Sequence, residues 1–579
     1  MIFNDIINSK KPLAKINQIA LLITTCFAII VGRLINLQIY QGAQLNALSM
    51  NNFTRVMHSQ SPRGNICDIN FNLLATNRPV KNLVWLGTGK RLLTETQKQK
   101  LEKVCLITGL HLSAELLKKI QAAERLEQEL VICGDISFAA LSKIEEQFTD
   151  DQNIAILSSV KRFYPYEKLA SHIIGYLGTM NVNKEGKMGL ERIFEESLRG
   201  TPGTKKLTIN SLGKQINDTE ITQTVTGATI RTTLDLELQK ICEECFDEQY
   251  TGSFIIMDPK TGAILSLLSR PNFNPAIFLD PLSDEMWNQL REKKPFINRA
   301  LGACYPPASI FKLITVASGI ELGLINPESH FRCNGHVVFS DRKYHCHNQN
   351  GHGTLTIREA LAQSCNILFY KLGKIVSIDV LADYAQKFGL GAKTGIILPE
   401  LEGLIPTTAW KIRTKGERWW IGETLSASIG QSYLLATPIQ IARMISALFD
   451  GYLSKPRILA DEPIIKQKLE IRPSTLEFLR ESMKLAVTSG TGRRVDKIAN
   501  LTIYAKTGTA QTCALDKESS QSSNLSHAWF VGNFGYKNEA PLTIVLMVEN
   551  AGSTKIAITI ARKFFNQYRT LMARRTNKN

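Results

Sequence analysis

The sequence predicts an α+β protein whose main domain is built on a five-stranded antiparallel sheet, behind a single membrane-spanning helix. Five β-rich runs predict the strands, at residues 253–257, 263–268, 501–504, 528–534 and 542–548. Helical patterns in most of residues 308–490 and in a closing segment at 556–571 would cover both faces of that sheet. A long apolar stretch close to the first residue predicts the membrane span.

The apolar stretch at residues 16–40 contains a single charged residue, Arg33. As a helix it can cross about 30 Å of hydrocarbon, with Arg33 reaching to the interface or facing a partner helix. Three lysines within residues 1–15 predict a cytoplasmic tail and export of everything after residue 40. A cleaved signal peptide is the alternative, although no small-residue cleavage site follows the apolar run. We expect a single-pass protein of the inner (cytoplasmic) membrane, with its exported part in the periplasm.

The chain is basic, with a formal net charge of +17 over 579 residues. The basic residues are dispersed, and only the tail at residues 574–578 is a cluster. Because no nucleic-acid-binding motif accompanies them, the excess indicates affinity for an anionic surface or polymer and not for nucleic acid.

Residues 41–230 predict a mixed α+β domain without chemistry of its own. Short apolar runs broken by turn residues suggest strands, and residues 92–129 have the spaced leucines and charged residues of helices. No cluster of paired acids or metal ligands occurs before residue 230.

The first candidate for chemistry is the pair Ser309 and Lys312. Pro306 and Pro307 suit the start of a helix that would run to Gly323 and carry both side chains on one face. A desolvated lysine can take the proton of a serine hydroxyl without a histidine, and a helix entrance favours the negative charge that develops. Such a tetrad also recurs by chance, so the alternative is a solvated pair on a surface helix.

Two further motifs follow in order, Ser364-Cys365-Asn366 and Lys506-Thr507-Gly508. Together with Ser309 and Lys312 they match the three motifs of serine β-lactamases and penicillin-binding proteins, with Cys where the middle motif usually has Asp.

The chain resembles the monofunctional class B penicillin-binding proteins, and within them the elongation-specific penicillin-binding protein 2 group. Besides the anchor and the three motifs, the resemblance is carried by Arg63-Gly64, Tyr164-Pro165, Gly189-Leu190-Glu191, Thr509 and His527-Ala528-Trp529-Phe530. It implies a pedestal or dimerisation domain at residues 41–230 and a transpeptidase domain at residues 231–579.

The resemblance implies that Ser309 attacks the D-Ala-D-Ala end of a peptidoglycan stem peptide and passes the acyl group to an amine of a neighbouring stem. Lys312 would act as base, with its pKa lowered by burial and by Lys506. Ser364 would relay a proton to the leaving amine, and Asn366 would hold Lys312 and the substrate amide. The strand at residues 506–509 would offer its edge to the acyl donor, with Gly508 leaving room for it, and the backbone N–H groups of Ser309 and Thr509 would form the oxyanion hole.

The same resemblance implies β-lactams as acylating inhibitors of Ser309 and a possible D,D-carboxypeptidase side activity. It also implies lipid-linked precursor as the source of substrate and a polytopic glycosyltransferase as partner. The alternatives are a β-lactamase, a receptor that senses β-lactams and a catalytically silent scaffold. The length and the anchor favour the cell-wall enzyme over a β-lactamase, and a tail of about 15 residues leaves no room for a signalling domain.

A metal site is predicted from Cys333, Cys346, His352 and Cys365, which offer the donor set of a structural tetrahedral zinc site. Cys365 lies inside the second motif, so a closed site would brace Ser364 and Asn366. His345 and His347 are alternative ligands, and a Cys333–Cys346 disulfide is the competing interpretation for an exported chain. The resemblance favours zinc, because some members of the elongation group carry it here, and implies no cofactor for the chemistry itself.

The pair Trp419-Trp420 fits packing better than a substrate groove. Trp529 fits an ordinary strand residue, and Gly430-Gln431 has no assignable role.

Overall fold

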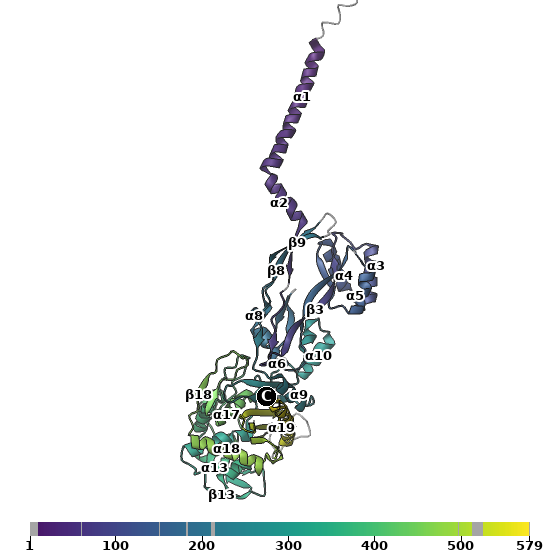
Figure 1. Cartoon of the computed structure of the whole chain (residues 1–579). Coiled ribbons are helices and arrows are strands. Elements are labelled where there is room, and N and C mark those ends of the chain that lie inside the picture. The colour runs from purple at the N-terminus through teal and green to yellow at the C-terminus, as the bar shows by residue number, and fades with distance from the viewer. Residues whose placement is uncertain are drawn as a thin grey trace, which may run out of the picture. The chain divides into compact units, whose positions relative to one another are not determined.

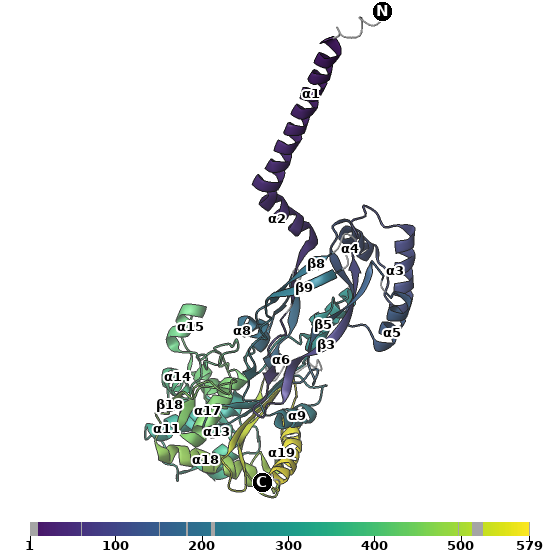
Figure 2. The same cartoon turned by 45° about the horizontal axis from the view of Figure 1, so that its top comes forward.

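We describe a computed structural model of the chain, covering residues 10–59, 61–149, 151–180, 183–209, 215–495, 497–511 and 525–577 (Figures 1 and 2). The fold divides into two compact units, each assembled from separate parts of the sequence. The first contains Met1–Pro62, Pro79–Lys161 and Gly200–Thr226, and the second contains Arg63–Arg78, Arg162–Arg199 and Gly227–Asn579. The domain boundaries at residues 40, 230 and 231 stay predictions.

The predicted membrane span is helical. Helix α1 (Lys10–Ile35) continues into the π-turn η1 (Asn36–Tyr40), and α2 (Gly42–Phe53) follows. Within the described residues, the segment Lys15–Tyr40 is long and apolar enough to cross a membrane, and none of its apolar window is buried by protein. The hydroxyl groups of Thr24 and Thr25 donate to carbonyls one turn earlier, at 2.8 and 2.7 Å, so these polar groups are satisfied within the helix. The first nine residues of the predicted cytoplasmic tail lie outside the described residues.

The first unit has a three-stranded sheet and a small α/β core. The sheet order is β1-β8-β9 (Thr54–Ser59, Gly203–Ile209 and Gln215–Thr222). The core lies between β4 (Glu129–Cys133), the second half of β3 (Leu73–Leu86) and three helices, α3 (Glu95–Thr108), α4 (Ala114–Arg125) and α5 (Phe138–Gln147). Helix α3 starts at a capping box between Thr94 and Gln97 and ends at Gly109, whose φ of 71° suits glycine. The helices predicted within residues 92–129 are therefore present.

The second unit contains the predicted five-stranded sheet, with the order β12-β11-β21-β20-β19 and antiparallel pairing throughout. The strands are β11 (Gly252–Met257), β12 (Ile264–Arg270), β19 (Leu501–Ala510), β20 (His527–Tyr536) and β21 (Leu542–Val548). Both faces are buried, as predicted. Along β11, Phe254 and Ile256 pack in one cluster with α9 (Leu236–Cys245) and α19 (Thr554–Thr576), whereas Ile255 and Met257 pack in the other cluster with α17 (Pro438–Asp450).

Strand β19 is the last in this order, so one of its edges has no neighbour in the sheet. The strand is longer than its predicted core at residues 501–504 and carries Lys506, Thr507 and Gly508 in its second half. The third motif therefore lies on an edge strand, where a peptide can add to the sheet.

Helices are the main regular structure of residues 308–490, as expected, but they make up less than half of that range. Three two-stranded antiparallel pairs also occur there: β13 with β16 (His330–Cys333 with Gly353–Thr356), the hairpin β14–β15 (His336–Phe339 with Arg342–His345), and β17 with β18 (Tyr452–Ser454 with Lys466–Lys468). The helices are α11 (Lys312–Glu321), α12 (Ile357–Ala362), α13 (Asn366–Ile375), α14 (Ile378–Lys387), α15 (Thr408–Lys415), α16 (Ile421–Ser428), α17 and α18 (Pro473–Thr488).

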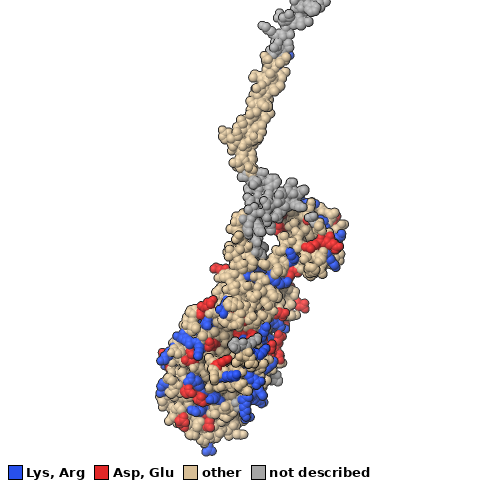
Figure 3. All heavy atoms as spheres, viewed as in Figure 1, with Lys and Arg blue, Asp and Glu red and all other residues tan. Residues whose placement is uncertain are grey.

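Charged side chains of both signs are interspersed over the surface of the second unit, whereas the described part of α1 is almost entirely uncharged (Figure 3). This distribution agrees with the dispersed basic residues of the sequence.

A buried ion-pair network accounts for three short motifs of the sequence. The carboxylate of Glu191 is fully buried and accepts from Nε of Arg63 at 2.6 Å and from Nε of Arg162 at 2.8 Å. The Tyr164 hydroxyl donates to the same carboxylate at 3.4 Å, and Arg63 also pairs with Glu195 at 2.7 Å. A Cβ on Gly64 would lie 2.0 Å from the carbonyl oxygen of Ala228, so this close approach of two backbones requires glycine.

We predict that Glu191→Gln destabilises the second unit by roughly 3–5 kcal/mol, because it leaves two buried guanidinium groups without their shared anion. The measurement is the apparent Tm of the purified full-length protein. Glu196→Gln is the control, since Glu196 is exposed in the next helix. Equal Tm values for the two variants would show that the network does not stabilise the fold.

Candidate active site

Ser309 lies in a short 3-10 turn, η3 (Ala308–Ile310), directly before α11, and not in the α-helix itself. The turn is held from outside: the backbone N–H of Ala308, whose φ is 50°, donates to the carbonyl of Gly430 at 2.8 Å. A Cβ on Gly430 would lie 2.0 Å from the Ala308 carbonyl oxygen, so only glycine permits this contact. Gly430 therefore fixes the backbone of the candidate nucleophile, a role that the sequence did not reveal.

Lys312 is the first residue of α11 and is fully buried. Its Nζ donates to the Ser364 carbonyl at 2.8 Å, to Asn366 Oδ1 at 2.7 Å and to Ser364 Oγ at 3.2 Å. Burial lowers the pKa of Lys312 to about 7, against the opposing effect of the Cys365 and Cys346 thiols. The structure therefore brings together the first and second motifs around one amine that can be neutral near neutral pH.

Lys506 approaches the same hydroxyl from β19. Its buried Nζ donates to Ser364 Oγ at 3.0 Å and to the Thr507 carbonyl at 3.2 Å. Burial, and then the positive charge of Lys312, hold the pKa of Lys506 well below its ordinary value. The predicted lowering of the Lys312 pKa by burial is confirmed, whereas the predicted contribution of Lys506 is wrong, because the like charge acts on the pKa of Lys506 instead.

Ser364 reaches both amines because its backbone is in the left-handed region, at φ 56°. It follows α12 and precedes α13, in a turn where the Cys365 N–H donates to the Ala360 carbonyl at 2.9 Å. Asn366 opens α13 and also donates from Nδ2 to the His345 carbonyl at 3.2 Å. The second motif is thus a strained turn that points two polar side chains at Lys312.

The remaining residues of the third motif line the strand edge. The Thr507 hydroxyl donates to that of Thr491 at 2.7 Å, and the exposed Thr509 accepts at its carbonyl from Gln431 Nε2 at 3.3 Å. A Cβ on Gly508 would make only ordinary contacts, at 3.4 Å and beyond. The fold alone therefore does not require glycine here, and the role of Gly508 in admitting the donor stays a prediction.

Trp529 contributes a contact that we did not predict. From the buried face of β20 its Nε1 donates to the Pro306 carbonyl at 3.1 Å, three residues before Ser309. This residue is therefore more than an ordinary strand residue, because it fastens the segment that leads into the turn.

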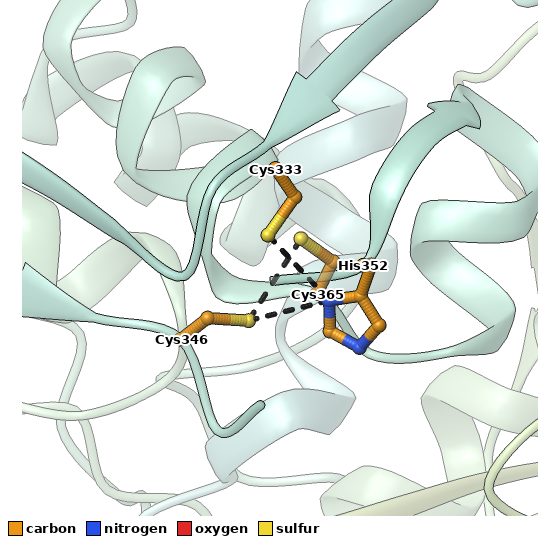
Figure 4. Close-up of side chains that lie close together, drawn as sticks. All are labelled: Cys333, Cys346, His352 and Cys365. Atoms are coloured by element: carbon orange, nitrogen blue, oxygen red, sulfur yellow. Dashed lines mark hydrogen bonds between the residues drawn. The ribbon is translucent and has the colours of Figure 1, made fainter. Parts of the chain in front are cut away.

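The four predicted metal ligands converge in the second unit (Figure 4). The sulfur atoms of Cys333, Cys346 and Cys365 and a ring nitrogen of His352 all lie within 4.8 Å of one another. His352 Nδ1 is 3.5 Å from the Cys333 sulfur and 3.6 Å from the Cys346 sulfur, and the Cys346 and Cys365 sulfurs are 3.9 Å apart. The four atoms lie in three buried side chains and one half-buried one, and they could hold a metal ion.

These distances fit a tetrahedral ion. With Zn–S and Zn–N bonds of about 2.3 and 2.1 Å, tetrahedral angles place two sulfurs about 3.8 Å apart and sulfur and nitrogen about 3.6 Å apart. Cys333 and Cys346 are free thiols in the structure, so the disulfide alternative is not observed. Of the alternative ligands, His347 has its Nδ1 3.9 Å from the Cys346 sulfur, whereas neither it nor His345 belongs to the set of four mutually close donors.

An open pocket of about 490 Å³ lies beside the end of β19. Trp420 lines it and is half exposed, whereas Trp419 is directed into the fold and donates from Nε1 to Thr424 Oγ1 at 2.8 Å. The packing interpretation is therefore right for Trp419 and wrong for Trp420.

Two family profiles match the chain. The one described as "Penicillin binding protein transpeptidase domain" covers residues 252–568, and the one described as "Penicillin-binding Protein dimerisation domain" covers residues 58–232.

Whole-length relatives and solved structures agree with these matches. The "Peptidoglycan D,D-transpeptidase MrdA" of Acinetobacter baumannii is 28% identical over 96% of this chain and 87% of its own length, and that of Haemophilus influenzae is 31% identical over 70% and 69%. The penicillin-binding protein PBP2 of Helicobacter pylori, solved in complex with MreC, superimposes with a TM-score of 0.75 at 26% identity, over 90% of this chain and 99% of the other. A chain of a structure titled as a peptidoglycan synthase complex gives 0.73 at 28% identity, over 95% and 97%. With its apolar N-terminal helix, its two matched domains and its three converging motifs, the chain belongs to the class B penicillin-binding proteins of the PBP2 type.

Proposed function

We propose that this protein is a peptidoglycan D,D-transpeptidase of cell-wall elongation that works through an acyl-enzyme on Ser309. The observation that carries the proposal is the convergence of Lys312 and Lys506 on the hydroxyl of Ser364, next to the turn that holds Ser309. The relatives are named peptidoglycan D,D-transpeptidases, and nothing in them supports a β-lactam receptor or a silent scaffold.

Lys312 is the base in the proposed mechanism. In its neutral form it takes the proton of Ser309 as the hydroxyl oxygen attacks the carbonyl carbon between the two D-alanines. Its bonds to the Ser364 carbonyl and Asn366 keep the amine in place. The proton then passes through the Ser364 hydroxyl, which can donate as well as accept, to the amine of the departing D-alanine.

Lys506 is the cationic partner once the donor is bound, because the carboxylate of the donor then offsets the burial and the Lys312 charge that lower the Lys506 pKa. Its bond to Ser364 Oγ orients the relay, and with Thr507 it offers positive charge and a hydroxyl to the terminal carboxylate of the donor. The backbone N–H groups of Ser309 and Thr509 would receive the oxyanion, and Asn366 would bind the substrate amide. The acyl group then passes to an amine of a second stem peptide, or to water in a D,D-carboxypeptidase side reaction.

We expect Ser309→Ala to abolish labelling by a fluorescent penicillin and release of D-alanine from a donor peptide, because no acyl-enzyme can form. Labelling is measured on gels of the purified full-length protein. Ser489→Ala, a change of an exposed serine at the end of α18, serves as control. Labelling of the Ser309→Ala protein at the rate of the control would refute Ser309 as nucleophile.

We expect the rate constant of acylation to rise about tenfold between pH 6 and pH 8, because the neutral fraction of an amine with pKa about 7 rises by that factor. The rate constant rises with pH because Lys312 is mostly charged below pH 7, and a charged amine cannot accept the proton of Ser309. Stopped-flow acylation by a slow β-lactam measures the profile, and Lys312→Arg should be inactive at every pH. A flat wild-type profile would contradict the assignment of the base.

We further propose that the Cys333, Cys346, His352 and Cys365 cluster binds a structural Zn²⁺. The tetrahedral spacing of the four donor atoms supports it. An ion held there would fix the hairpin β14–β15 to the turn that presents Ser364 and Asn366, and would take no part in the acyl transfer itself.

The metal proposal predicts one zinc per chain in the wild type and less than a tenth of that in Cys365→Ser, by elemental analysis. Cys304→Ser is the control, since Cys304 is a free thiol outside the cluster. Zinc content that is unchanged in Cys365→Ser would rule the site out.

The apolar helix at Lys15–Tyr40 supports a single-pass anchor, and we propose an N-terminus in the cytoplasm and a transpeptidase unit in the periplasm. The substrates would be stem peptides delivered by lipid-linked precursor, with a polytopic glycosyltransferase as partner. One similar protein was solved with MreC and another within a peptidoglycan synthase complex, which supports work in an assembly.

A further inference from the structure

The pocket beside the end of β19 has no part in the mechanism above. Three segments of the second unit form its walls: the hairpin β14–β15, the start of α16 and the turn after α16. Its lining includes Arg342, Tyr344, Trp420, Glu423, Gln431 and, just beyond β19, Gln511. Because Gln431 Nε2 donates to the Thr509 carbonyl, the pocket is joined directly to the strand edge.

The direction in which the acyl-donor peptide runs along β19 determines which of its residues reaches this pocket. The placement of the donor rests on the proposed function. Lys506 and Thr507 would receive the terminal carboxylate, and Ser309 the carbonyl before it. If the donor pairs antiparallel with β19, its C-terminus lies beside Lys506 and Thr507. Its preceding residues then lie progressively closer to Thr509 and Gln511. At about 3.3 Å per residue, the residue preceding D-Ala-D-Ala arrives at the mouth of the pocket.

The donor's own backbone can use the Thr509 carbonyl. An N–H of the incoming peptide can bond to this carbonyl beside the amide of Gln431 or in its place, because a carbonyl oxygen has two lone pairs. A peptide bound at this carbonyl would therefore have its upstream residues next to Gln431 and the pocket lining.

The charges of the pocket favour an anion. Arg342 is exposed, lies 5.5 Å from the Tyr344 ring centroid and makes no ion pair in the described part of the chain. The acidic residue of the lining, Glu423, is already paired with Nζ of Lys411 at 2.6 Å, and Lys411 is only 1% exposed. The guanidinium of Arg342 is thus the charge that remains for a ligand.

The hairpin that carries Arg342 also has a fixed relation to the site. The carbonyl of His345, three residues along β15, accepts from Asn366 Nδ2, and Cys346 follows in the metal-ligand cluster. A Cβ on Gly422 would lie 2.7 Å from the Tyr344 hydroxyl, so the hairpin closes against the start of α16. Arg342 is therefore held at a defined distance from the strand edge.

We propose that this pocket is a subsite for a carboxylate carried by the acyl-donor peptide upstream of D-Ala-D-Ala, and that Arg342 is its specificity-determining residue. Two donor carboxylates share this chemistry: a side-chain carboxylate on the residue directly before D-Ala-D-Ala, and one on the residue before that. The strand register favours the first.

The test uses the full-length protein in detergent and two pairs of synthetic donors ending in D-Ala-D-Ala. Within each pair the peptides differ only in a carboxylate or a carboxamide, placed one residue before D-Ala-D-Ala in the first pair and two before it in the second. The second-order rate constant for release of D-alanine is measured for each peptide. The wild type should prefer the carboxylate about fivefold in the first pair, as for a half-solvated charge-assisted contact.

Arg342→Gln should lower that preference to less than twofold, and Arg342→Lys should retain part of it. The matched control is Lys343→Gln, which removes the same charge from the adjacent residue, whose side chain is on the opposite face of the hairpin. It should keep the wild-type preference.

Acylation by 6-aminopenicillanic acid, a penicillin without an acyl side chain, reports Ser309 chemistry independently of the pocket. A wild type that this compound does not acylate contradicts the proposed function. Normal acylation combined with no carboxylate preference in either pair overturns the subsite, as does an equal loss of preference in Arg342→Gln and Lys343→Gln. If Arg342→Gln is not acylated by 6-aminopenicillanic acid, the subsite is tested by the carboxylate preference of the wild type and of Arg342→Lys. No preference in the wild type, or an undiminished preference in Arg342→Lys, would then overturn it.

Discussion

The structure of the site depends on one electrostatic constraint: two buried amines share one serine hydroxyl. Lys312 and Lys506 both donate to Ser364 Oγ, at 3.2 and 3.0 Å, and both are withdrawn from solvent. Burial disfavours two ammonium charges around one hydroxyl, and it lowers the pKa values of both amines, that of Lys312 to about 7. The fold thereby produces a free base without a histidine.

The surrounding fold keeps the amines on that hydroxyl. Ser364 sits in a left-handed turn whose next residue, Cys365, belongs to the thiol and imidazole cluster, and Lys506 is fixed by the register of β19 with β20. The turn of Ser309 is fixed separately, by the Gly430 backbone and by the Trp529 contact to Pro306. Each of the three motifs is therefore held by a different element of the second unit.

The sequence predicts the parts of this site that short patterns encode. Reactive side chains at a fixed spacing, such as Ser309 and Lys312, can be recognised in the sequence alone, as can Cys365 within the second motif. Apolar runs likewise predict the strands of the sheet. The contacts that position these parts are not encoded locally. The approach of Gly430 to Ala308, the strand pairs before Ile357 and the pocket walls at Trp420 and Arg342 join residues far apart in the chain, and the two compact units combine discontinuous segments.

The most direct test of the shared-hydroxyl account is to observe the protons themselves by neutron diffraction from crystals of the protein grown at pH 8 in D₂O. The account predicts that at least one of the two Nζ atoms carries only two deuterons, with a deuteron on Ser364 Oγ between the amines. Three deuterons on both amines at this pH would contradict it, because no base would then be present to activate Ser309.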